Sequence, residues 1–151
     1  MRAPVLLAAL VGLVAFVAPV AAQSLQRAPR INYMTNCQGC HLPSGEGMAG
    51  KVPPMRGQLA NFLLVPGGRE FLVRVPGVAN STLNDADLAA LMNWLVPAMG
   101  PALPQPFKPY TAQEVGALRR MRLQDVRAAR NALIQKMPAP TRMAMAEPPT
   151  P

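Results

Sequence analysis

The chain is poor in side chains that bind metals, with two cysteines and one histidine among 151 residues. A structural zinc site needs about four ligands of these types, which excludes that class of site. Aromatic residues make up only 5% of the chain, and no basic-aromatic motif indicates a nucleic-acid partner. Acidic residues are also few, with 7 against 15 basic ones and a formal net charge of +8.

The cysteines and the histidine all lie in one segment, Cys37-Gln38-Gly39-Cys40-His41. Two thiols three positions apart, followed directly by a histidine, are the attachment pattern of a c-type haem. The thiols add to the porphyrin, and the histidine binds the iron from the proximal side. We therefore predict one covalent haem c on Cys37 and Cys40, with His41 as the metal ligand. A thioredoxin-like pair would need a βαβ context, which is missing; a chance match or a plain disulfide remains an alternative.

The first 22 residues have the pattern of a signal peptide. Arg2 supplies a positive charge, residues 5–17 are apolar, and small residues lead up to Ala22. We expect cleavage after Ala22 and export to the periplasm, with an uncleaved membrane anchor as the alternative. Removal of Arg2 leaves 14 basic and 7 acidic residues, a formal charge of +7. About 130 residues remain, enough for one domain.

Helical signals surround the haem motif. Pro29 suits the first position of a helix that leads into the cysteines. Seven glycines and prolines in residues 42–57 predict a loop that folds over another part of the structure, and neither a helix nor a strand. Short helices are expected at 61–64 and 68–75, each bounded by Pro-Gly pairs.

The clearest helix is the one that follows. Asn84 is a suitable N-cap with Asp87 three residues on, a variant of the capping box. Leucines and a methionine then recur at helical spacing, and Pro97 is expected to end the helix.

This order of elements resembles the class I monohaem c-type cytochromes over residues 29–99. The resemblance implies an all-α, cytochrome c-like haem domain at 23–99 that carries single electrons between redox partners and is not an enzyme. In that family a proline twelve residues after the histidine offers its carbonyl to the imidazole, and a residue two positions later packs on the haem. A pair of aromatic residues packs where the first and last helices cross. The matching haem-pocket residues here are Pro53, Met55, Tyr33 and Trp94.

The chain departs from the family on the distal side of the iron. The usual sixth ligand is a methionine before a proline, whereas here Val75 precedes Pro76. We favour an open or weakly ligated iron, with Asn80 as the weak ligand. The alternatives are a bound water or one of several residues from unexpected places: Met48, Met92, Met99, Lys108 and Tyr110. An open site also suits a haem-based small-ligand binder or sensor. A peroxidase-like activity is not favoured, because there is no second histidine.

Beyond residue 99 the composition changes. Residues 100–110 are predicted to be a Pro-rich linker, and 111–136 a basic amphipathic helix that opens with a capping box at Thr111 and Glu114. Residues 137–151 are predicted to be disordered. The helix either packs on the haem domain or docks an acidic face of a redox protein or an anionic membrane surface.

Overall fold

The computed structural model describes residues 28–100, 103 and 106–146. The predicted signal peptide and its cleavage site after Ala22 lie outside these residues. All the regular elements in the described part are helices, apart from an isolated bridge between Met48 and Val52. The all-α prediction is therefore confirmed. No helix within the described ranges has the length and apolar character needed to cross a membrane.

Short helices make up the first part of the fold. The haem motif itself forms a one-turn helix, and a second one-turn helix follows α3, neither of which the sequence had indicated. The predicted loop at 42–57 is confirmed. The elements are α1 (Pro29–Asn36), α2 (Gln38–His41), the 3-10 helix η1 (Leu59–Leu64), α3 (Gly68–Arg74) and α4 (Pro76–Ala79).

The longest helix, α5 (Asp85–Met99), begins as expected and ends later than expected. The Asn84 side chain accepts a hydrogen bond of 2.8 Å from the Asp87 amide, which confirms the cap. The prediction that Pro97 ends the helix is wrong by two residues. A proline removes one helical hydrogen bond, but Val96 and Met99 are buried on either side of it and keep the last turn in place.

The C-terminal part differs most from the sequence prediction. The capping box holds, with Thr111 Oγ1 accepting from the Glu114 amide at 3.1 Å. The single helix over 111–136 is wrong, because α6 (Ala112–Leu118) and α7 (Val126–Lys136) are separated by a turn. Asp125 caps α7 by accepting a 2.8 Å bond from the Ala128 amide.

A further helix lies in the region predicted to be disordered. This is α8 (Ala139–Ala146), so that prediction is wrong for these residues. Residues 147–151 lie outside the described ranges. Met145 on α8 is 4% exposed and accepts a 3.3 Å hydrogen bond from Asn61, so α8 joins the fold through a specific contact.

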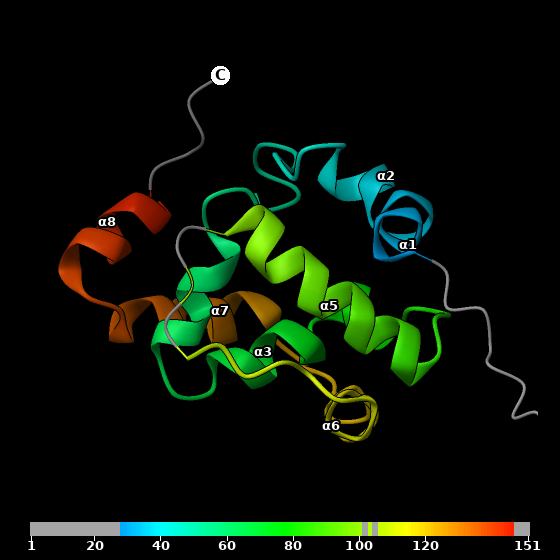
Figure 1. Cartoon of the computed structure of the whole chain (residues 1–151). Coiled ribbons are helices and arrows are strands. Elements are labelled where there is room, and N and C mark those ends of the chain that lie inside the picture. Colours follow the sequence, from blue (N-terminus) through cyan, green and yellow to red (C-terminus); the bar gives the residue numbers. More distant parts are fainter. Residues whose placement is uncertain (1–27, 101–102, 104–105, 147–151) are drawn as a thin grey trace, which may run out of the picture.

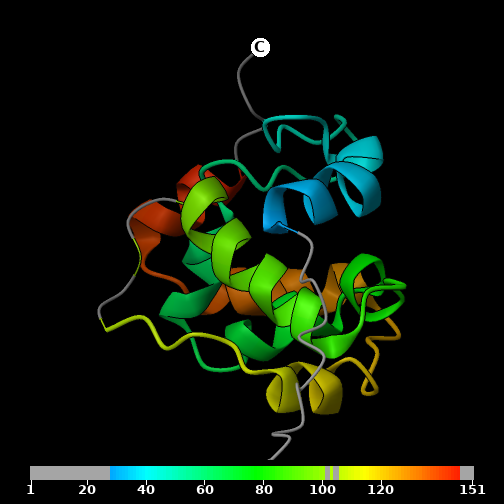
Figure 2. The same cartoon turned by 45° about the vertical axis from the view of Figure 1, so that its right-hand side comes forward.

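Helix α5 runs through the middle of the molecule (Figures 1 and 2). Helices α1 and α2 lie on one side of it, and α3, α6 and α7 lie on the other. Helix α5 contacts α1, α6 and η1, while α3 contacts α6 and α7. The C-terminal part contributes six buried apolar residues to the core: Tyr110, Val115, Leu133, Ile134, Met137 and Met145. It is therefore a structural part of the domain.

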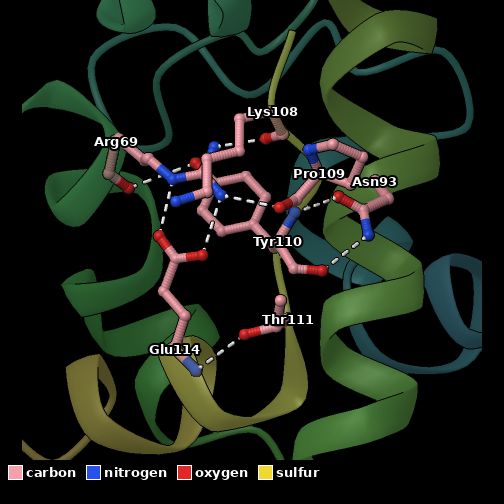
Figure 3. A network of polar contacts seen from close by, with 7 residues as sticks. All are labelled: Arg69, Asn93, Lys108, Pro109, Tyr110, Thr111 and Glu114. Atoms are coloured by element: carbon pink, nitrogen blue, oxygen red, sulfur yellow. Dashed lines mark hydrogen bonds and ion pairs between the residues drawn. The ribbon is translucent and has the colours of Figure 1, made fainter.

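The predicted linker is tied down at its end. Asn93 on α5 pairs with both backbone groups of Tyr110, at 2.9 and 2.7 Å (Figure 3). Arg69 on α3 lies over the Tyr110 ring at 3.8 Å and forms a two-pronged pair with Glu114, at 2.6 and 2.8 Å. Arg69 also donates to the carbonyls of Lys108 and Pro109. These contacts fix the entry of the chain into α6.

Candidate haem site

The two cysteines lie on the short helix that continues α1. Cys37 is the C-cap of α1 and the N-cap of α2, and the His41 amide bonds back to its carbonyl at 3.0 Å. Both thiols are free; Cys37 is half-buried and Cys40 exposed. Burial raises the pKa of the Cys37 thiol, and Cys40 raises it further. The helix therefore presents two free thiols and an imidazole within about one turn.

His41 is half-buried at the end of α2. Burial lowers the pKa of its imidazole, and the Pro53 carbonyl acts in the opposite direction. The Nδ1 atom is buried and makes no hydrogen bond of ordinary geometry within the described part of the chain. A neutral imidazole with a carbonyl acceptor close to the ring is the state in which histidine binds a metal.

Gly47 brings the Pro53 backbone close to the histidine. Its amide donates to the His41 carbonyl at 3.1 Å, and its φ is +71°. A Cβ atom here would lie 2.4 Å from the Val52 oxygen and 2.9 Å from the Pro53 oxygen. Only glycine fits this position, and the sequence had marked it only as one loop glycine among several.

Leu42, directly after the histidine, has a strained backbone with φ 63° and ψ 166°. Such a conformation costs about 1–3 kcal/mol outside glycine and is typical of functional sites. The Tyr33 hydroxyl donates to the Leu42 carbonyl at 2.5 Å and helps to hold this turn. Burial raises the pKa of Tyr33, so the hydroxyl remains a donor at neutral pH. No residue pattern in the sequence indicated this strain.

The other haem-pocket candidates surround the same segment. The Tyr33 and Trp94 rings pack against each other with centroids 5.9 Å apart and planes tilted by 52°. Met55 is buried, and its amide donates to the Gly45 carbonyl at 2.8 Å. The structure thus brings the proximal candidates together from α1, α2, the loop and α5.

Asn80 lies elsewhere, at the C-cap of α4. It is exposed and lines a hollow of about 480 Å³ that it shares with Asp85 and three arginines of the C-terminal part. Those arginines are Arg119, Arg120 and Arg122. The sequence did not indicate that this segment and the C-terminal part would meet.

The remaining distal candidates are mostly engaged in the fold. Met92 and Met99 are 1% and 8% exposed within the core. The Tyr110 hydroxyl donates to the Arg69 carbonyl at 3.2 Å. Met48 forms an isolated β-bridge with Val52, in the loop that also bonds to His41 through Gly47. Lys108 is exposed.

The residues at α2 fit a covalently attached haem. The fit rests on two free thiols, on the neutral imidazole and on its buried Nδ1 atom, with the Pro53 carbonyl near the ring. An imidazole held in this way has its other nitrogen available for iron.

Comparison with known proteins points in the same direction. No protein-family model matches the chain. Cytochrome c-552 of Thermus thermophilus is 35% identical over 131 residues, which cover 73% of this chain and 88% of that protein. A second cytochrome c-552 sequence from Thermus thermophilus is 37% identical over 118 residues, or 64% of this chain and 90% of the relative.

Each alignment contains more positions than there are residues of this chain in it. The 131 aligned positions correspond to 73% of 151 residues, about 110, so about 20 positions of that relative have no counterpart here. The second alignment has 118 positions and covers 64% of this chain, so about 20 positions of the second relative also have no counterpart here. With this extent of similarity, the chain belongs to the cytochrome c-552 family: it is a monohaem c-type cytochrome, an electron carrier with a covalently bound haem c.

Proposed function

We propose that Cys37 and Cys40 carry the haem and that His41 is its proximal iron ligand. The observation that carries this assignment is the one-turn helix α2, which presents both free thiols beside a half-buried imidazole. Bound haem supplies one-electron chemistry, because its iron cycles between the ferrous and ferric states. The chain positions the imidazole and limits access of water to it.

The roles of four further residues follow from their places around this helix. Pro53 is proposed as the acceptor that orients the His41 ring, which makes the imidazole a stronger ligand. We propose Met55 as a wall of the haem pocket. Tyr33 and Trp94 hold α1 against α5, and their contact of 5.9 Å supports a packing role.

The assignment is tested with the double variant C37S/C40S. A denaturing gel stained for haem should show a band for the wild-type protein and none for the double variant. H41A is the matched variant: it should keep the covalent haem and lose the wild-type visible spectrum. Covalent haem in the double variant would show that the attachment site is wrong.

For the partner, we propose a redox protein with an acidic docking face. Exposed arginines of the C-terminal part supply positive charge, among them Arg120, Arg122 and Arg127. A membrane-bound helix must have a free apolar face, whereas Val115, Leu133 and Ile134 are buried in the core. The fold therefore favours an acidic protein over an anionic membrane surface.

The charge of the docking surface can be measured with small oxidants. The reduced protein should react faster with anionic ferricyanide than with a cationic cobalt complex of matched potential, and salt should reduce that preference. R120Q/R122Q should lower the ferricyanide rate and leave the haem spectrum unchanged. Equal rates at all salt concentrations would contradict a basic docking face.

Export to the periplasm is proposed on the pattern of the first 22 residues. An intact mass measured on protein from the periplasmic fraction should correspond to a chain that begins at Gln23. A chain retained in the cytoplasm at full length would contradict export.

A second candidate function is the binding of small ligands on the distal side of the iron. It is supported by the ten-residue connector from Val75 to Asn84 and by the exposure of Asn80. The usual methionine before the proline is also absent from this connector, because Val75 precedes Pro76. Rapid binding of carbon monoxide to the ferrous protein, with a high-spin ferric spectrum, would support an open site. An inert low-spin haem would exclude it.

A further inference from the structure

The connector between α3 and α5, residues 75–84, has few backbone bonds to the rest of the fold. Its one-turn helix α4 bonds within itself, and the carbonyls of Ala79, Ser81 and Leu83 follow at alternate positions. Three side chains of the connector pack partly against the core: Val75, Val78 and Leu83. Something outside the connector must fix the path of its second half.

Arg119 does this from the C-terminal part of the chain. Its guanidinium donates to Ala79 O at 3.3 Å through Nε, to Leu83 O at 2.8 Å through Nη1, and to Ser81 O through Nη2. Nη1 also pairs with Asp85 Oδ1 at 3.1 Å. The Arg119 side chain is 15% exposed. A planar guanidinium with several fixed donors holds these three carbonyls in one arrangement.

Arg119 is itself held firmly. It is the C-cap of α6, and its amide bonds to the carbonyl of the fully buried Val115 at 2.9 Å. Helix α6 approaches the start of α5 so closely that a Cβ on Gly116 would lie 2.3 Å from Asp85 Oδ2. The guanidinium is therefore anchored at a fixed place, and the connector adapts to it.

The turn after α6 also holds the first end of the connector. Arg74 donates through Nε to the Met121 carbonyl at 2.5 Å, and the Leu123 amide donates to the Arg74 carbonyl at 3.3 Å. Residues 119–123 thus lie alongside the connector from end to end. The connector lies beside the start of α5, between helices α1 and α2 on one hand and α6 on the other (Figures 1 and 2).

We propose that Arg119 is a positioning residue that holds connector 75–84 as the wall facing the distal side of the haem, and so controls access of small molecules to the iron. This inference rests on the haem attachment proposed above. It holds whether the iron is open or carries a sixth ligand from the connector, because in both cases the ligand must pass or displace this segment. Loss of the guanidinium releases three carbonyls together and loosens the wall.

The test compares the holoproteins of wild type, R119A and R119K, with R122A as the matched control. Arg122 is an exposed arginine from the same turn, lining the same hollow. The association rate of carbon monoxide with the ferrous protein should rise about tenfold in R119A, within the range seen when a packed network between sites is altered. R119K, which keeps the charge but lacks the planar fork, should give a smaller increase. R122A should bind carbon monoxide at the wild-type rate.

Each outcome separates this inference from the proposed function. If the wild type carries no covalent haem, the attachment assignment fails, and the inference that rests on it is overturned as well. If all four proteins carry haem but R119A and R119K bind carbon monoxide at the wild-type rate, while only their melting temperatures fall, Arg119 is purely structural and the inference is overturned. If R119A does not fold, R119K decides the question by the same rate and by its reduction potential, which should differ from wild type.

Discussion

The two segments proposed to face the haem are held in opposite ways. Loop 42–57 is fixed mainly by backbone bonds within and next to itself: Gly47 bonds to His41, and Met55 and Arg56 bond to Gly45. At its end, one further bond joins the Gly57 amide to the Met99 carbonyl on α5. Connector 75–84 is fixed by the side chain of Arg119, about forty residues further along the chain. The histidine side is therefore encoded locally, whereas the opposite side depends on the C-terminal part.

Removing the C-terminal part should have the largest effect. A chain ending at Gly100 loses six buried apolar residues, each worth about 1.5–3 kcal/mol of burial. That sum is comparable to the total stability of a typical domain, about 5–15 kcal/mol, so we expect no cooperative thermal transition by circular dichroism. A chain ending at Ala146 keeps all the described helices and is the control. A truncated chain that melts near the wild-type temperature would mean that connector 75–84 does not depend on Arg119.

The self-supporting loop can be broken from within. G47A places a Cβ against the oxygens of Val52 and Pro53 at φ +71°, and we expect a loss of about 3 kcal/mol in the free energy of unfolding. G50A is the matched control, because its φ is +70° and nothing lies within 4 Å of its Cβ position. That variant should lose only about 1 kcal/mol. Equal losses in urea unfolding would show that backbone conformation, and not the approach of Pro53, determines the need for glycine.

A smaller and pH-dependent effect is expected at the anchor of α6. The hydrogen bond from Arg69 holds the pKa of Glu114 below its ordinary value. A carboxylate with a lowered folded pKa stabilises the fold above its unfolded pKa, and this contribution disappears as the pH falls through the folded pKa. E114Q should therefore lose about 1 kcal/mol at pH 7, and its difference from wild type should shrink in acid, below about pH 4.5.

The measurement is chemical unfolding of E114Q and wild type between pH 3 and pH 7. E70Q, which changes an exposed glutamate of α3, serves as the control and should follow wild type throughout. A constant difference between E114Q and wild type across this range would mean that the pair with Arg69 contributes through packing and not through charge.

The sequence indicated the parts of this molecule that depend on local chemistry. Asn84 caps α5 and Thr111 caps α6 through bonds that span three residues, and such patterns are visible in a linear sequence. The contact between Tyr33 and Trp94 was also anticipated, because it follows from the resemblance and from helical spacing.

The features that the sequence did not indicate depend on distant contacts. The turn between α6 and α7 contains no glycine or proline, and it forms where Arg119 and Arg74 bind across to other segments. Helix α8 is marked by proline and alanine, which suggest disorder, but Met145 is buried against Asn61. Side-chain bonds to carbonyls forty residues away leave no periodic pattern in a sequence.

The closure of the core by α7 and α8 sets an order of assembly for the whole chain. Translation begins at the N-terminus, so Cys37 emerges 100 residues before Met137 and 108 before Met145. Until those residues arrive, the core surface that they cover remains open, and α3 lacks its contact with α7. The thiols are thus presented on a chain that has not yet closed, and Met137 and Met145 complete the core of a domain whose cofactor site was made long before them.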